Sequence, residues 1–212
     1  MKKVVIGGGG HNALIAAIYL AKAGLSITIL EKGSVGGATV SQKVFPDYEA
    51  KLSRYAYLIA LLPDKIVKDL NIKTKTLSRN VASFTPTLIN GKDKGLLINT
   101  KIGEKTKNDF KEITGNDLEI KAWQSFYNDV YKFAQVIAPT MTEKLPTRSE
   151  LRARVNHPIW EELVERPIGE SLNKRFENDL IKGIVLTDGL IGTFASSDEL
   201  QANICFIYHL IG

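Results

Sequence analysis

The sequence predicts an α/β protein in which a strand–helix–strand unit precedes a mixed, mainly helical region. A β-branched run at residues 3–6 ends in four consecutive glycines, and residues 12–23 have helical composition, with Gly24 placed to stop the helix. Residues 26–30 form a second apolar run, which we expect to be a buried strand. From Gly103 onward the apolar spacing is mostly helical. These observations indicate one βαβ unit at the N-terminus, followed mainly by helices.

The glycines between the first strand and the helix match the pattern G-x-G-x-x-G/A, which is typical of dinucleotide-binding Rossmann-like units. The register that fits is Gly8, Gly10 and Ala13. A start at Gly7 would instead place Asn12 at the third position, where a small residue is required. The first glycine allows a tight turn, the second lets the backbone approach a pyrophosphate, and the third lets helix and strand pack closely. The diphosphate would lie at the helix N-terminus, whose amides and dipole favour negative charge.

An acidic residue, Glu31, follows the second apolar run directly. It lies near the spacing of about 20 residues beyond the glycines at which an acid binds the adenosine ribose hydroxyls, where it would also repel a 2′-phosphate. Two simpler interpretations stay open, because four glycines also form ordinary tight turns and Glu31 is also suited to be a strand-end charge. The order of strand, glycines, helix, strand and acid favours dinucleotide binding.

A second glycine pair comes soon after Glu31, in the stretch Lys-Gly-Ser-Val-Gly-Gly-Ala at residues 32–38. Together with residues 8–13, this stretch resembles the FAD-binding N-terminus of the phytoene desaturase-like flavoproteins. Within them it is most similar to the branch called pyridine nucleotide-disulphide oxidoreductase domain-containing protein 2. The likeness continues outside the glycine-rich segments, at residues 45–48, 52–57, 66–70 and 187–195.

The resemblance implies an FAD-dependent oxidoreductase, whose flavin accepts hydride from a C–H or amine substrate. It implies that the FAD diphosphate and ribose bind at residues 8–13 and Glu31, and that Gly36 and Gly37 line the path to the flavin. The implied cofactor-binding residues are Gly8, Gly9, Gly10, His11, Asn12, Ala13, Glu31, Lys32, Gly36, Gly37 and Ala38. Two of them depart from the family pattern, since Ala13 replaces the glycine usual in the branch and Ala38 replaces the arginine of typical phytoene desaturases.

Several functional alternatives stay open. An NAD-dependent dehydrogenase uses the same fingerprint, and a truncated nucleotide-binding or assembly module would carry it without turnover. His11 either flanks the diphosphate or is an exposed residue at the start of the helix. Arg54 and Tyr55 either face the flavin or substrate or take part in a structural ion pair. No catalytic residue is identified.

We expect two domains, both incomplete. Residues 1–75 form the FAD (dinucleotide)-binding βαβ region, and residues 76–212 form a mixed strand and helical portion of a substrate domain. The expected elements after the βαβ unit are a short helix at 63–70, strands at 81–85 and 95–98 around an Asn90-Gly91 turn, and a helix at 116–137 whose apolar stripe enters the core. Because a doubly wound sheet needs several parallel strands, we expect the chain to be the N-terminal part of a flavoenzyme.

The composition is that of an ordinary globular protein, with 44% hydrophobic and 24% charged residues. The net charge of +5 is spread along the chain, which gives no indication of a nucleic-acid partner. No segment approaches the ~20 apolar residues of a membrane-spanning helix. The only cysteine, Cys205, excludes an internal disulfide and, in its apolar surroundings, is expected to be a core thiol.

A cytoplasmic location is expected, because a lone cysteine fits a reducing compartment and the N-terminus enters a strand without a signal-peptide pattern. The histidines and Cys205 show no metal-ligand spacing, and hydrolase and triphosphatase motifs are absent from the sequence. We expect a small-molecule substrate. The apolar segment 204–211 must fold back onto its own core or bury against another copy, so we also expect a homodimer through this segment or a second chain that completes the fold.

Overall fold

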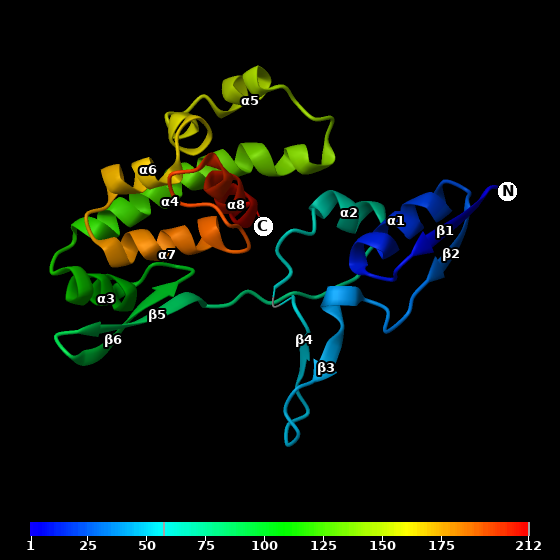
Figure 1. The fold of residues 1–212 in the computed structure, drawn as a ribbon, viewed down its shortest axis with the longest axis horizontal. Helices are drawn as coiled ribbons and strands as arrows, with labels where there is room; N and C mark the ends of the chain where they lie inside the picture. The colour runs from blue at the N-terminus through cyan, green and yellow to red at the C-terminus, as the bar shows by residue number, and fades with distance from the viewer. Residues whose placement is uncertain (57, 212) are drawn as a thin grey trace. The chain divides into compact units, whose positions relative to one another are not determined.

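The computed structural model describes residues 1–56 and 58–211. They form two compact units, Met1–Lys75 and Thr76–Gly212, whose helices and strands are labelled in Figure 1. The α/β fold class predicted from the sequence is confirmed. Tyr57, which belongs to one of the segments that resemble the flavoproteins, lies outside the described residues.

The N-terminal unit begins with the predicted βαβ arrangement, made by β1 (Lys3–Gly7), α1 (His11–Lys22) and β2 (Ser26–Leu30). The two strands are parallel, with Lys3 opposite Ser26 and Gly7 opposite Leu30. Figure 1 shows α1 lying along this strand pair. The helix ends where the sequence predicts, because Gly24 adopts a left-handed conformation with φ of 83° and its amide donates to the Ala21 carbonyl.

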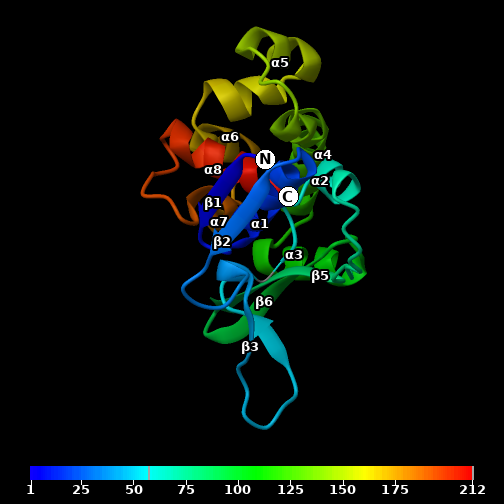
Figure 2. The same ribbon diagram turned by 90° about the vertical axis from the view of Figure 1, so that its right-hand side faces the viewer.

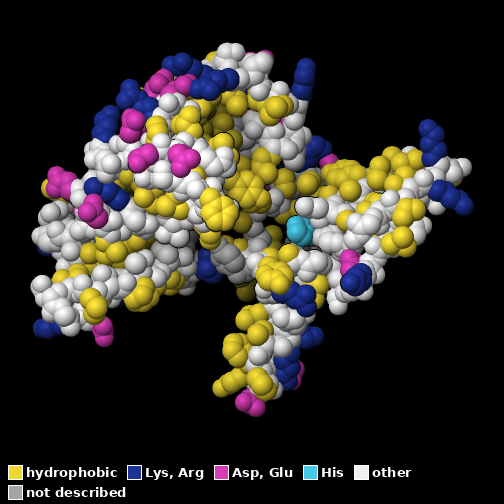
Figure 3. All heavy atoms as spheres, in the orientation of Figure 1, with side chains coloured by type: hydrophobic (Ala, Val, Ile, Leu, Met, Phe, Trp, Pro, Cys, Tyr) yellow, Lys and Arg dark blue, Asp and Glu magenta, His cyan; other side chains and the backbone are white. Residues whose placement is uncertain are grey.

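The expectation that residues 26–30 form a buried strand is wrong for one face of the sheet. Leu30 is 61% exposed, and Val5 on the neighbouring strand is 64% exposed. Parallel strands are buried when helices cover both faces of the sheet, whereas this sheet has two strands and packs against α1. Figure 3 accordingly shows hydrophobic side chains at the surface of the N-terminal unit.

The rest of this unit consists of short elements. A 3₁₀ turn, η1 (Gly37–Thr39), leads into an antiparallel hairpin of β3 (Ser41–Lys43) and β4 (Lys51–Ser53). The short helix predicted at 63–70 is confirmed as α2 (Asp64–Asp69). This helix is joined to α1, since the Tyr19 hydroxyl donates to the Asp69 carboxylate at 2.8 Å and Lys22 Nζ donates to the Asp69 carbonyl at 2.7 Å.

The C-terminal unit starts with a hairpin of β5 (Val81–Ile89) and β6 (Lys92–Asn99), which confirms and extends the strands predicted at 81–85 and 95–98. Asn90 and Gly91 both have positive φ, 51° and 73°, as a two-residue hairpin turn requires. Strand β6 packs against α3 (Glu104–Thr114), where the buried Asp109 carboxylate accepts from the Leu97 amide at 3.1 Å. The other side of the hairpin is exposed.

Helices build the remainder of the C-terminal unit, as Figures 1 and 2 show. They are α4 (Leu118–Ile137), η2 (Ala138–Thr142), α5 (Arg148–Val155), the π-helical turn η3 (Glu161–Glu165), α6 (Ile168–Arg175), α7 (Asp179–Leu190) and α8 (Leu200–Leu210). Phe126 of α4 is fully buried against Phe176 and Phe206, with ring centroids 5.8 and 5.9 Å away. The prediction that the α4 stripe enters the core is thereby confirmed, except that Leu118 and Tyr131 are exposed.

The C-terminal helix folds back onto this core. Ala202 and Phe206 are fully buried, and so is the polar Asn203, which accepts from the Ile168 amide at 2.8 Å. The structure therefore shows that residues 204–211 pack onto the core of their own chain, which is the first of the two expected outcomes. Cys205 is half-buried and donates to the Ile191 carbonyl at 3.0 Å, so the expectation of a core thiol is wrong. Cys205 lies on α8 next to the buried face of the helix, and Phe206 is on that buried face.

Candidate dinucleotide-binding site

The glycine-rich loop between β1 and α1 turns sharply at Gly8. Gly8 has φ of +94°, and its amide donates to the Leu30 carbonyl at the end of β2, at 2.7 Å. Gly10 is the N-cap of α1 and has extended backbone angles. The tight turn therefore falls at the first glycine of the register Gly8, Gly10 and Ala13, which is the position that needs glycine for its backbone conformation.

The N-terminus of α1 offers hydrogen-bond donors. No side chain caps the helix, and within the described residues the Asn12 and Ala13 amides have no acceptor. A Cβ atom built on Gly10 would meet no protein atom within 4 Å. The first turn of α1 thus presents free amides beside open space, which is the arrangement that binds phosphate groups.

Glu31 connects this loop to the segment that follows β2. Its Oε2 accepts from the Gly9 amide at 2.5 Å, and its Oε1 accepts from the Gly33 amide at 2.7 Å. These hydrogen bonds, the one from Gly33 first, hold the pKa of the Glu31 carboxyl below its ordinary value. Each carboxylate oxygen has a second lone pair, and the side chain is exposed, so Glu31 can still accept from a ribose hydroxyl.

Glycine at position 9 leaves room for the Glu31 side chain. Gly9 is buried, and a Cβ atom at this position would lie 3.3 Å from both Cβ and Oε2 of Glu31. A side chain here would push the carboxylate away from the amide that it accepts from. The third glycine of the four-glycine run is therefore explained by its contact with Glu31.

The second glycine pair lies directly beside the first loop. The Gly36 amide donates to the Gly9 carbonyl at 2.7 Å, and Gly36 forms a parallel bridge with Gly10. Gly36 and Gly37 have φ of 120° and 58°, and a Cβ atom on Gly37 would lie 3.0 Å from the Gly10 Cα. Both positive φ and close approach require glycine at these two positions. The two glycine-rich segments therefore form one contiguous surface with Glu31 between them.

The other predicted residues lie around this surface. His11 and Asn12 are exposed in the first turn of α1, Lys32 is exposed, and Ala13 is half-buried. Ala38 accepts from the Tyr55 amide at 3.1 Å and from Ser53 Oγ at 3.2 Å, which ties η1 to β4.

Two roles are open for Arg54, a position facing the flavin or substrate and a structural ion pair. Its Nη2 donates to Gln42 Oε1 at 3.4 Å, and it forms no ion pair with any residue that the structure describes. Sequence reasoning missed Gly33, whose amide holds Glu31, and the only signal for it was a glycine two positions after the acid.

The surface formed by the two glycine-rich segments and Glu31 can bind an anionic group, hold it against the backbone and accept hydrogen bonds from hydroxyl groups. Within residues 1–56 and 58–211, no three His, Cys, Asp or Glu side chains are grouped as metal ligands would be. Over the same residues, no helix has the length and apolarity needed to cross a membrane.

Comparison with known proteins agrees with this geometry. Residues 6–62 match the family model of the NAD(P)-binding Rossmann-like domain. Uncharacterized proteins of Mycobacterium bovis and Mycobacterium tuberculosis are 40% identical over 219 residues, which cover 99% of this chain and 41% of each relative. Pyridine nucleotide-disulfide oxidoreductase domain-containing protein 2 of Rattus norvegicus is 28% identical over 98% of this chain and 40% of its own length.

The chain spans about two fifths of the length of these curated relatives. No solved structure is a significant match to it. The mixed α/β chain thus begins with a segment that matches the NAD(P)-binding Rossmann-like domain, and it is distantly homologous to pyridine nucleotide-disulfide oxidoreductase domain-containing protein 2.

Proposed function

We propose that this chain is the cofactor-binding part of an FAD-dependent oxidoreductase of the phytoene dehydrogenase-like type. The diphosphate binds at the first turn of α1, and the adenosine ribose binds at Glu31. When bound, FAD supplies the redox chemistry by accepting hydride from a C–H or amine substrate. The chain's own residues bind the adenosine half and orient the cofactor.

The observation that carries this proposal is the contact between the two glycine-rich segments. Gly36 and Gly37 follow the ribose-binding acid and press against Gly9 and Gly10 without side chains between them. A bare backbone on this side lets a long cofactor continue past its diphosphate, which favours FAD over a nicotinamide dinucleotide. The remote homology to an oxidoreductase domain-containing protein supports the same class of reaction.

Calorimetric titration of the purified chain with FAD and with ADP tests the proposal, using a pair of valine variants. Gly10→Val adds a branched side chain at a position where a Cβ atom would meet no neighbouring protein atom within 4 Å, so we expect the fold to be retained and the ligand to be obstructed. We expect its affinity for both ligands to fall by at least about tenfold, or 1.4 kcal/mol.

Gly7→Val is the matched control, because Gly7 also has open space around it but stands outside the register Gly8, Gly10 and Ala13. We expect it to bind both ligands as the parent does. Equal affinities in the Gly10→Val variant and the parent would remove the glycine loop from the binding site.

An NAD-dependent dehydrogenase is the second candidate, and the description of the matching family model favours it. An absorption spectrum with and without added FAD separates the two, because a flavoprotein becomes yellow and a nicotinamide enzyme stays colourless. A nucleotide-binding or assembly module without turnover of its own is the third candidate. A chain that binds FAD or ADP but catalyses no hydride transfer would support that third candidate.

We assign the two units separate roles within this function. Residues 1–75 form the dinucleotide-binding domain, and residues 76–212 contribute to a domain that binds the substrate. Expressing the first unit by itself would test the division, since it contains every residue of the proposed cofactor site. Retained ADP binding by residues 1–75 is the expected result.

A further inference from the structure

Helix α5 is weakly anchored in the C-terminal unit. It has no fully buried residue, whereas α6, which is also eight residues long, has four. Leu151 and Val155 are half-buried against the hydrophobic core, and the other six residues of α5 are exposed. Figures 1 and 2 both place α5 at the margin of this unit. Apolar burial therefore contributes little to holding α5 in place.

Ion pairs hold α5 instead. Each of its three arginines pairs with a glutamate outside the helix: Arg148 with Glu165, Arg152 with Glu161 at 2.6 Å, and Arg154 with Glu143 at 3.6 Å. The arginine side chains are 48 to 64% exposed. Exposed ion pairs are weak, and dissolved salt screens them.

Both ends of α5 are capped by residues within the helix or adjacent to it in sequence. Thr147 and Glu150 form a reciprocal capping box at the N-terminus. At the C-terminus Asn156 adopts a left-handed conformation, with φ of 39°, and its amide donates to the Arg152 carbonyl. No residue elsewhere in the described part of this unit caps α5. The helix can therefore move away without leaving unpaired backbone groups at its ends.

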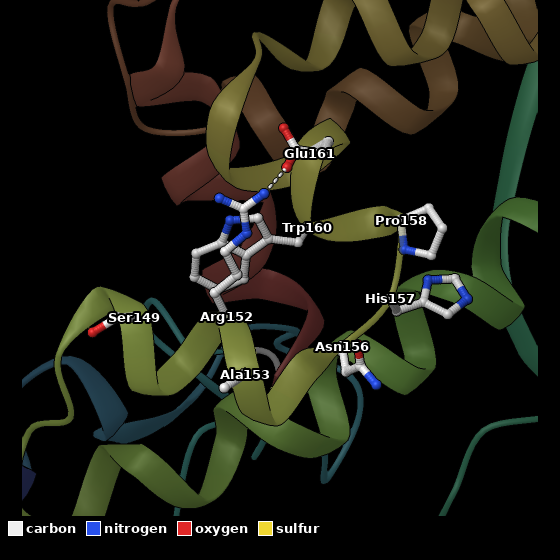
Figure 4. A pocket seen from close by; sticks show the side chains of 8 residues that line it. All are labelled: Ser149, Arg152, Ala153, Asn156, His157, Pro158, Trp160 and Glu161. Carbon is white, nitrogen blue, oxygen red and sulfur yellow. Dashed lines mark hydrogen bonds and ion pairs between the residues drawn. The ribbon is translucent and has the colours of Figure 1, made fainter.

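A pocket of about 520 Å³, open to solvent, lies between α5 and the turn that leads into η3 (Figure 4). Its walls are Ser149, Arg152, Ala153, Asn156, His157, Pro158, Trp160 and Glu161. Trp160 is only 4% exposed, and its indole N–H donates to Glu165 at 2.7 Å. Because Glu165 also accepts from Arg148, the environment of this indole is coupled to the attachment of α5.

We propose that α5 is a lid held by its three arginine–glutamate pairs, which detaches as ionic strength rises and uncovers Trp160, one of the residues that line the open pocket. The proposal is independent of cofactor binding, so its failure and that of the flavoenzyme assignment are distinguishable.

Hydrogen exchange of the unmodified chain tests this directly, with α6 as the internal reference. Between about 0.02 M and 0.5 M NaCl, the amides of α5 should exchange at least about tenfold faster, while those of α6 change less than about twofold. An α5 whose exchange is insensitive to salt, or an equal response in both helices, would overturn the proposal.

Fluorescence quenching gives a second readout, because the chain has two tryptophans and Trp123 is buried in the core. With acrylamide, a neutral quencher, quenching of Trp160 in the Trp123→Phe variant should rise with salt. At low salt, Arg148→Gln combined with Arg152→Gln should reproduce the high-salt exchange of α5. Lys107→Gln, which removes the exposed pair with Glu104 on α3, is the control and should not. A double variant that exchanges like the control would mean that the ion pairs do not hold the lid.

Discussion

The two units of this chain are stabilised in different ways. In the C-terminal unit, a cluster of eighteen buried residues includes five phenylalanines and two tryptophans. In the described part of the N-terminal unit, the single buried apolar side chain is Ala17, and the loops are fixed by hydrogen bonds and positive-φ glycines. The N-terminal unit is thus built around backbone groups that can meet a ligand, while the C-terminal unit is built around a packed core.

The proposed cofactor site therefore has little hydrophobic stability of its own. Ligand binding stabilises a folded state by an amount that rises with ligand concentration relative to Kd. We therefore expect bound FAD or ADP to protect the N-terminal unit far more than the C-terminal unit.

Phe126→Ala should have the largest effect, because it removes a fully buried ring that packs against Phe176 and Phe206. We expect the C-terminal unit to lose about 3–5 kcal/mol of unfolding free energy. Scanning calorimetry measures the shift, and Tyr131→Ala on the exposed side of α4 serves as the control. If hydrogen exchange in β1 and β2 accelerates equally, the two units do not unfold independently.

Asn203→Ala should destabilise the C-terminal unit by about 1–3 kcal/mol, because it leaves buried backbone groups without partners. The side chain accepts from the Ile168 amide and donates to the Leu163 and Arg166 carbonyls, at 2.8 to 3.0 Å. Urea unfolding compares it with Gln201→Ala, an exposed change on the same helix. An equal midpoint for the two variants would mean that water replaces all three bonds.

Self-association is expected through the exposed face of α8, where Leu200, Ile204 and Tyr208 follow one another at helical spacing. Ile204 is 61% exposed, so Ile204→Glu changes this face without entering the core. We expect the variant to weaken a homodimer by about tenfold in Kd, as read by light scattering across concentrations. A parent chain that stays monomeric at high concentration would contradict the prediction, and Gln201→Glu controls for the added charge.

A further prediction concerns the titration of Glu31. Its charged form is stabilised by the Gly33 and Gly9 amides, so its pKa lies below the ordinary value. The two hydrogen bonds are therefore fully present at neutral pH, and their contribution is lost as pH falls through this lowered pKa.

In NMR spectra, the Gly9 and Gly33 amide shifts should move together, with a midpoint below the ordinary pKa of a glutamate side chain. Glu31→Gln should abolish this shared titration. We expect Glu31→Ala to weaken ADP binding by about 1–3 kcal/mol, and an unchanged affinity would leave Glu31 a purely structural acid.

Much of the fold was predictable because it depends on neighbours in sequence. The helix stop at Gly24, the hairpin turn at Asn90 and Gly91, and the amphipathic α4 follow from backbone conformation and apolar periodicity. The register of the glycine fingerprint could likewise be chosen from residue size at each position. The exposure of β2 was missed, because strand burial depends on which elements cover the sheet.

Residue order is enough to predict the βαβ unit, its glycine loop and the acid after β2, since strand, turn and helix signals act over a few residues. The folded structure was needed to see that Glu31 accepts from Gly9, 22 residues away, and that Gly36 and Gly37 press against the same loop. It also showed that α8 folds back to bury Phe206, and that α5 is held by arginine–glutamate pairs beside an open pocket. These features depend on contacts between segments that are distant in sequence. Their geometry is set by packing and backbone direction, so short-range sequence patterns do not reveal it.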